Sequence, residues 1–419
     1  MLKHSRNVRK RLSIPARRAV VFISGLGLLA ACVDGSNESD TGLAQTADSV
    51  EIESISLTAE DFTEAENPDE VFELLEQLRP VAEAGEGKIA VLLPDTQSSA
   101  RYVEQDTPAF ERAFEVMGLQ DDYVIHNAQA NSQRQATQAE QAITDGASVL
   151  LLDNLDSGSG AAIQANADAQ GVPTIDYDRL TVNGSATHYV SFDNEYVGTL
   201  LAEGVVECIE EWGIEKPELF VLAGAPTDNN ATLSQVGIDD VVDPLEDAGD
   251  LNIVGKVRVD DWDNQVGQTM FEQALTANPE MNAVVSGNDG LAQAAISILK
   301  NQGVDPKKFP TTGQDATTQG LQNILAGYQC MTVYKPVHAE AAAAAALAVF
   351  LRAGMEPPEG LVNGEYDAES HKVPSLLVKP ISVNASNMKD TVFRDGFADP
   401  DDICVDDLVE ICEENGILK

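Results

Sequence analysis

Polar side chains follow several short apolar runs along the middle of this chain. They include carboxylates, amides, one arginine, one lysine and one tryptophan, in segments 94–96, 178–179, 226–230, 259–264, 287–289, 313–315 and 334–336. Carboxylates and amides pair with neighbouring hydroxyls, arginine adds a fixed fork of donors, and an aromatic face covers the C–H side of a pyranose. These residue types therefore indicate a binding site for a polyhydroxylated ligand.

Each of these segments also has an ordinary structural explanation. An Asp after a strand is commonly the N-cap of the next helix. Arg179 could form a surface ion pair, and Lys335 could be a solvated edge lysine. Trp262 lies between Asp261 and Asp263, and a core position flanked by two acids is awkward, so we interpret it as a site aromatic. The recurrence of polar groups after successive strands, more than any single residue, predicts the site.

The sequence lacks the patterns that common catalytic sites require. The five histidines are scattered, with neither HExxH nor a Cys/His metal spacing. It contains no GxSxG and no phosphate-binding Walker loop. Paired acids could serve glycoside hydrolysis, but no two are singled out by their surroundings. We therefore expect no enzyme, no cofactor and no metal, with an extracytoplasmic glycosidase as the enzymatic alternative.

Strand-length apolar runs alternate with helical patterns from residue 88 onward. The runs are nearly continuous in hydrophobicity, as in strands buried on both faces, and span 89–94, 123–126, 148–153, 173–177, 219–223, 252–259, 283–286, 310–313 and 331–334. Helical spacing appears between them, for example at 107–117, 132–145 and 292–301. This order predicts an α/β protein with doubly wound parallel sheets, where ligands bind beyond the carboxyl ends of the strands.

The N-terminal residues 1–32 are predicted to be a signal peptide. Seven Lys or Arg and no acid occur in residues 1–31, and an apolar run at 19–31 ends directly before Cys32. The run is shorter than the roughly 20 residues that cross a bilayer. LLAAC at 28–32 resembles a bacterial lipobox. It predicts lipidation of Cys32 and an extracytoplasmic protein anchored to the cell membrane.

The rest of the chain is strongly acidic. The formal net charge of −43 argues against a nucleic-acid partner, because such partners require a basic surface. Residues 33–86 are acidic and rich in Ser and Thr, which predicts a solvated tether with room for one short amphipathic helix at 68–84.

Four cysteines follow Cys32, namely Cys208, Cys330, Cys404 and Cys412. An even number in an exported protein predicts two disulfide bonds, for which three connectivities exist. The short separation of the last two favours a bond within the tail at 401–419, and the full connectivity stays open at this point.

Several segments together resemble the D-xylose-binding protein family, whose members are extracytoplasmic solute-binding proteins of sugar ABC importers. The matching segments include YDRLTVNGSATHYVSFDN, PTDNNATL, VVSGND, TGQDATTQGLQNILAGYQCMTVYKP and VPSLLVKPISVNASNMKDTVFRDGF. The start LLPDTQSSARY resembles the branch of broad-specificity aldose binders. The resemblance covers residues 88–397 and excludes the tether and the tail.

The resemblance implies a type I periplasmic-binding-protein fold, with two Rossmann-like lobes joined by a three-segment hinge. Residues 87–192 and 336–372 would form the N-terminal lobe, and 193–335 and 373–400 the C-terminal lobe. The sugar-contacting positions carried over are Arg101, Tyr102, Asp178, Arg179, Asp228, Asn230, Trp262, Asn288, Asp315 and Lys335. Tyr102 stands where the family commonly has Trp, so the expected ligand is D-xylose or a related aldose.

The same resemblance implies a function and partners. The protein would capture one monosaccharide, act as a monomer, and deliver the sugar to an ABC permease with its ATPase subunit. A binding protein that feeds a sensor or chemoreceptor is the alternative. The implied fold also places Cys208 and Cys330 at the same end of the C-terminal lobe, which predicts a bond between them.

Overall fold

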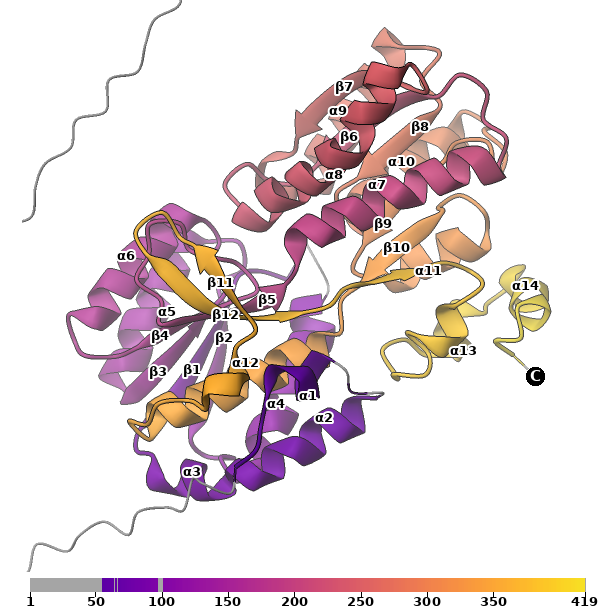
Figure 1. Cartoon of the computed structure of the whole chain (residues 1–419). Coiled ribbons are helices and arrows are strands. Elements are labelled where there is room, and N and C mark those ends of the chain that lie inside the picture. Colours follow the sequence, from indigo (N-terminus) through magenta and orange to yellow (C-terminus); the bar gives the residue numbers. More distant parts are fainter. Residues whose placement is uncertain (1–54, 64, 66, 97–100, 419) are drawn as a thin grey trace, which may run out of the picture. The chain divides into compact units, whose positions relative to one another are not determined.

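A computed structural model describes residues 55–63, 65, 67–96 and 101–418. The predicted signal peptide, Cys32 and the first part of the predicted tether lie outside the described residues. The described chain forms two α/β lobes, and it passes between them at three places (Figure 1).

The first lobe is built on a seven-stranded sheet in the order β11-β12-β5-β4-β3-β1-β2. Its strands are β1 (Lys88–Leu93), β2 (Tyr123–Asn127), β3 (Ala147–Leu152), β4 (Thr174–Tyr177), β5 (His188–Phe192), β11 (Gly364–Asp367) and β12 (Lys372–Val378). All neighbouring strands are parallel except β11 and β12, which form an antiparallel pair at the edge. The expected parallel sheet is therefore extended by one antiparallel edge strand.

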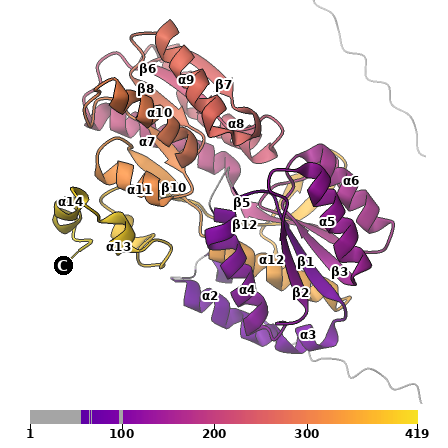
Figure 2. The same ribbon diagram turned by 180° about the vertical axis from the view of Figure 1, so that it is seen from behind.

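Helices cover both faces of this sheet (Figures 1 and 2). On one face, α4 (Thr107–Val116) and α12 (Val337–Arg352) pack on alternate residues of β1, namely Ile89, Val91 and Leu93. On the other face, α5 (Ser132–Thr144) and α6 (Ser157–Asp168) pack on the intervening residues Ala90 and Leu92. Alternation of side chains across a strand explains why continuous apolar runs fill two separate cores.

The second lobe repeats this arrangement with two three-stranded sheets. One has the order β7-β6-β8 and the other β13-β10-β9, and a bridge between Val284 and Thr311 links them. The strands are β6 (Glu218–Ala223), β7 (Asn252–Arg258), β8 (Ala283–Ser286), β9 (Thr312–Gln314), β10 (Met331–Tyr334) and β13 (Ile381–Val383). The helices are α7 (Asn194–Glu211), α8 (Asn229–Ala248), α9 (Asn264–Ala277), α10 (Asp289–Asn301) and α11 (Thr318–Leu325), with the short turn η4 (Asp260–Trp262) before α9.

The three crossings are short segments between the lobes. The first joins β5 to α7 at Asp193, which caps α7 by accepting a hydrogen bond from the backbone N–H of Tyr196. The second joins β10 to α12 at Lys335 and Pro336. The third lies between β12 and β13, because β12 pairs with β5 and β13 pairs with β10. Residues 373–378 therefore belong to the first lobe and not, as the sequence analysis expected, to the second.

Residues 55–84 differ from the tether that the sequence predicted. They form α1 (Ala59–Thr63), α2 (Pro68–Leu75), η2 (Glu76–Leu78) and α3 (Arg79–Ala84). Their apolar side chains, including Phe62, Phe72, Leu75 and Leu78, are buried in the same core as α12. Pro68 and Pro80 stand in the first turns of α2 and α3, where proline is tolerated. The short amphipathic helix expected at 68–84 is therefore present, divided into α2, η2 and α3, whereas the expectation of a solvated tether is wrong for these residues.

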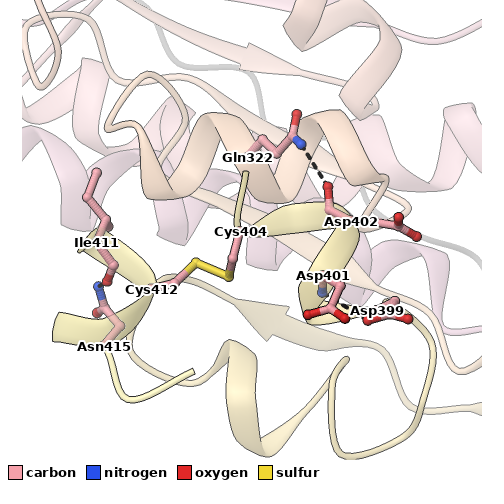
Figure 3. The surroundings of a disulfide bond; sticks show 8 residues. All are labelled: Gln322, Asp399, Asp401, Asp402, Cys404, Ile411, Cys412 and Asn415. Atoms are coloured by element: carbon pink, nitrogen blue, oxygen red, sulfur yellow. Dashed lines mark hydrogen bonds between the residues drawn. A yellow bond between two sulfur atoms is a disulfide. The ribbon is translucent and has the colours of Figure 1, made fainter. Parts of the chain in front are cut away.

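The C-terminal segment packs against the second lobe through η6 (Met388–Asp390), α13 (Pro400–Ile403) and α14 (Leu408–Glu414). Cys404 and Cys412 are bonded within it, and Gln322 of α11 donates a hydrogen bond of 3.0 Å to the carbonyl of Asp402 (Figure 3). The other bond joins Cys208 of α7 to Cys330, with their Cα atoms 6.1 Å apart. Both predicted pairs are thus present in the structure.

Candidate functional site

One cavity is lined by all ten residues that the resemblance selected. It also receives four residues that were not selected, namely Asn194, Ala231, Ser234 and Gln314. Its volume is about 30 Å³, well below the roughly 300–1,000 Å³ of pockets that hold drug-sized ligands. A sugar ring therefore requires the two rims to move apart before it can enter.

Residues of the first lobe reach the cavity from the carboxyl ends of β1 and β4. Arg101 and Tyr102 follow β1 and begin η3 (Tyr102–Asp106), a π-helical turn. Asp178 and Arg179 follow β4 directly. Asp178 has a φ of 58°, a left-handed conformation that costs about 1–3 kcal/mol in a non-glycine residue and is concentrated at functional sites.

Residues of the second lobe hold equivalent positions at the ends of its strands. Asp228 and Asn288 are the N-caps of α8 and α10, and accept hydrogen bonds from the backbone N–H groups of Asn230 and Leu291. Asp315 follows β9 with a φ of 92°. Capping and cavity lining are therefore compatible, because one carboxyl or amide group has several sites for hydrogen bonds.

Arg101 is held by three carboxylates. Its Nε and Nη2 donate to the two carboxylate oxygens of Asp106 at 3.0 and 2.7 Å. Its Nη2 also donates to Glu340 Oε2 at 2.7 Å, and its Nη1 to Asp178 Oδ1 at 3.2 Å. Such bidentate, charge-assisted contacts fix the plane of the guanidinium group. Glu340 lies on α12, just after the second crossing, so this network joins the site to the hinge.

The Tyr102 hydroxyl links Asp178 and Arg179, the two residues that follow β4. It donates to Asp178 Oδ2 at 3.2 Å and accepts from Arg179 Nη2 at 3.1 Å. The side chain of Tyr102 is buried. Its phenol group therefore positions the Asp178 carboxylate and the Arg179 guanidinium group, and Tyr102 also lines the cavity.

Direct contacts connect the two rims. Arg179 Nε lies 3.3 Å from Asp228 Oδ2, and Asn230 Nδ2 donates to the carbonyl of Asp178 at 2.8 Å. Trp262 donates from its Nε1 to the same Oδ2 of Asp228 at 3.0 Å. The lobes are thus held together through polar groups that a hydroxylated ligand could also use.

Burial and charge together set the protonation of the carboxyl groups. Burial alone would raise the pKa of Asp178, but the charges of Arg101, Lys335 and Arg179 hold the pKa below its ordinary value. Burial, together with the Asp178 charge, raises the pKa of Asp153 well above its usual range. Asp178 therefore remains a charged acceptor in the site.

Sequence reasoning missed three buried carboxylates that support the site without lining it, namely Asp106, Asp153 and Glu340. Glu340 is fully buried in α12, where it is the only acid in a run of alanine and other apolar residues. That lone charge was a usable signal, since isolated acids are almost never fully buried without a partner. Asp106 ends the π-helical turn, and nothing in its sequence context identified it.

Metal and membrane features are absent from the part of the chain that the structure describes. No group of three or more His, Cys, Asp or Glu side chains there could hold a metal ion. No helix among these described residues is long and apolar enough to cross a membrane.

The fold and the site define a class of protein. The profile of the periplasmic binding protein domain matches residues 89–356. A solute-binding protein from Clostridium phytofermentans, solved with bound β-D-glucose, aligns with a TM-score of 0.67 and 26% identity, covering 75% of this chain and 99% of that chain. A carbohydrate-transporter solute-binding protein from Chloroflexus aurantiacus, in complex with D-glucose, also has a TM-score of 0.67, with 25% identity, covering 75% of this chain and 97% of that chain. The protein is a type I periplasmic binding protein.

Sequence relatives identify the family more closely. The D-xylose-binding periplasmic protein of Escherichia coli is 36% identical over 319 residues, which cover 75% of this chain and 92% of the relative. A multiple sugar-binding periplasmic protein of Azospirillum brasilense is 31% identical, with 74% of this chain and 89% of the relative covered. The chain belongs to the D-xylose-binding protein family of periplasmic sugar-binding proteins.

Proposed function

We propose that this protein captures a monosaccharide, D-xylose or a related aldose, between its two lobes and delivers it to an ABC permease. The observation that carries the proposal is the composition of the cavity. Its charged lining consists of three cations and three carboxylates, namely Arg101, Arg179, Lys335, Asp178, Asp228 and Asp315. Balanced charges among amides and one indole suit a neutral polyhydroxylated ring better than an anion or a cation.

Capture follows from ligand-dependent closure. A sugar that contacts Asp178 on one rim and Asp228 on the other binds the closed arrangement better than an open one. It therefore shifts the equilibrium toward closure. The closed form would dock on the permease, whose ATPase subunit drives import.

The protein would act as a binding component and not as an enzyme. Its export would depend on the signal peptide, and Cys32 would carry the lipid that anchors it to the membrane. We expect a monomer, because one lobe pair forms the complete cavity. No cofactor is required for this function.

A thermal-shift screen tests the proposal. Xylose, glucose, galactose, arabinose and ribose would be compared, since binding stabilises the native state by RT ln(1 + [L]/Kd). At least one aldose should raise the melting temperature in a concentration-dependent way. Equal melting temperatures with all five sugars would contradict the proposal.

A further inference from the structure

The cavity between the two lobes extends beyond the ten positions that the resemblance selected. It is also lined by Asn194 of α7, Ala231 and Ser234 of α8, and Gln314 of β9. All four belong to the second lobe, so this lobe contributes more of the lining than the sequence indicated. Two of them, Ser234 and Gln314, carry polar groups that the rest of the protein does not engage.

Gln314 brings a buried amide to the cavity. Its side chain is 8% exposed and lines the cavity. Its Oε1 is buried and has no hydrogen-bond partner among the residues that the structure describes. Neighbouring residues of a strand face opposite sides, and a Cβ added to Gly313 would meet the carboxylate of Asp289. The Gln314 amide therefore lies on the face of β9 away from Asp289, where it lines the cavity.

Ser234 brings a hydroxyl to the same cavity. It lies four residues after Asn230 on α8, and residues at this spacing share one face of a helix. Its side chain is 7% exposed. Thr232 of the same helix donates to the carbonyl of Asp228 at 3.4 Å, whereas the Ser234 hydroxyl makes no hydrogen bond within the described part of the chain. This hydroxyl is therefore available to a ligand.

We propose that Gln314 and Ser234 bind hydroxyl groups of the sugar, as two ligand-contacting residues in addition to the ten that the resemblance selected. A buried polar group without a partner costs free energy, and a bound hydroxyl removes this cost because it can both donate and accept. The inference rests on the proposed function, since it requires an aldose in the cavity. An aldose without a hydroxyl at these two side chains would leave them unpaired, so they would contribute to the choice between aldoses.

Calorimetric titration with the best aldose, together with thermal unfolding without sugar, tests the inference on the full chain. Gln314→Met and Ser234→Ala remove the two polar groups with little change in volume. Each should raise the Kd at least about fivefold, because a sugar hydroxyl would be left buried without a partner. Neither group has a protein partner to lose, so without sugar each variant should melt at or above the wild-type temperature.

Gln329→Met is a matched control in the same lobe. The Gln329 amide is 1% exposed and donates to Asp289 at 2.8 Å and to the carbonyl of Met331 at 3.1 Å. It does not line the cavity between the lobes. This variant should melt below the wild-type temperature and should keep the Kd within about twofold.

Two results would overturn the inference and leave the proposed function intact. One is an increase in Kd of less than about fivefold in either Gln314→Met or Ser234→Ala. The other is a melting temperature below that of the wild type in both variants without sugar, as in the control, because it would show that these groups stabilise the fold. A wild-type protein that binds no aldose would instead refute the proposed function and the inference together.

Discussion

Trp262→Ala removes the aromatic side chain that lines the cavity between the two lobes. The indole is 8% exposed and belongs to the core of the second lobe. It rests on Gly224 and Gly287, where an added Cβ would meet the ring, and its Nε1 donates to Asp228 at 3.0 Å. The residue therefore contributes to both folding and the binding site.

The two contributions have different expected sizes. Truncation of a buried Trp to Ala costs about 3–5 kcal/mol of folding stability. Loss of an aromatic hot spot costs at least about 2 kcal/mol of binding free energy, which is about a thirtyfold increase in Kd. Trp262→Phe keeps a ring but removes the donor to Asp228. A hydrogen bond to a charged group contributes about 1.5–3 kcal/mol, so this variant should be less stable than the wild type.

Urea unfolding without sugar and calorimetric titration with the best aldose separate these effects. Circular dichroism establishes that each variant is folded under the titration conditions. The alanine variant should lose stability and affinity together, and the phenylalanine variant should lose less affinity. A folded Trp262→Ala variant with wild-type affinity would refute the assignment of this residue to the sugar site.

Three further predictions concern stability. Burial raises the pKa of Asp289 to about 7, so the stability from its bound proton is present below about pH 4 and is lost as the pH rises through about 7. The free energy of unfolding in urea should therefore fall between these pH values, and it should fall less steeply in Asp289→Asn. The same pH dependence of the unfolding free energy in both proteins would refute this. Phe72→Ala should cost about 3–5 kcal/mol in the same assay if α2 belongs to the core, whereas a cost below about 1 kcal/mol would favour the tether. Removal of the Cys404–Cys412 bond by a double serine substitution should cost about 2–3 kcal/mol of folding stability, as expected for a short loop. Sugar affinity should stay within about twofold of the wild type, and a large loss of affinity would show that the C-terminal segment affects the sugar site.

Much of the fold could be predicted from local apolar patterns. The nine strands and three helices for which the sequence analysis gave ranges begin and end within three residues of the expected positions, because a strand buried on both faces has a continuous apolar run that its sequence shows directly. The position of the third crossing was harder to predict from the sequence. The run 372–378 is compatible with either lobe, and only its pairing with β5 decides between them.

The site was predictable where residues follow strands, and less so where contacts are distant in sequence. Asp178 and Trp262 stand out beside apolar runs or between acids, and the family resemblance selected them. The contact of Arg101 with Glu340 joins positions 239 residues apart, and no local pattern encodes it. The helical segment expected at 68–84 is confirmed as α2, η2 and α3. Its packing against α12 was missed for a related reason, since no local pattern shows which helix covers its apolar face.

A crystal structure of the protein grown with its preferred aldose would show whether both lobes bind the sugar. We expect one sugar ring in the cavity between the two lobes, within hydrogen-bond distance of Arg101 or Asp178 on the first lobe and of Asp228 or Asn288 on the second. A sugar bound to one lobe alone, or at a site away from these residues, would contradict this expectation.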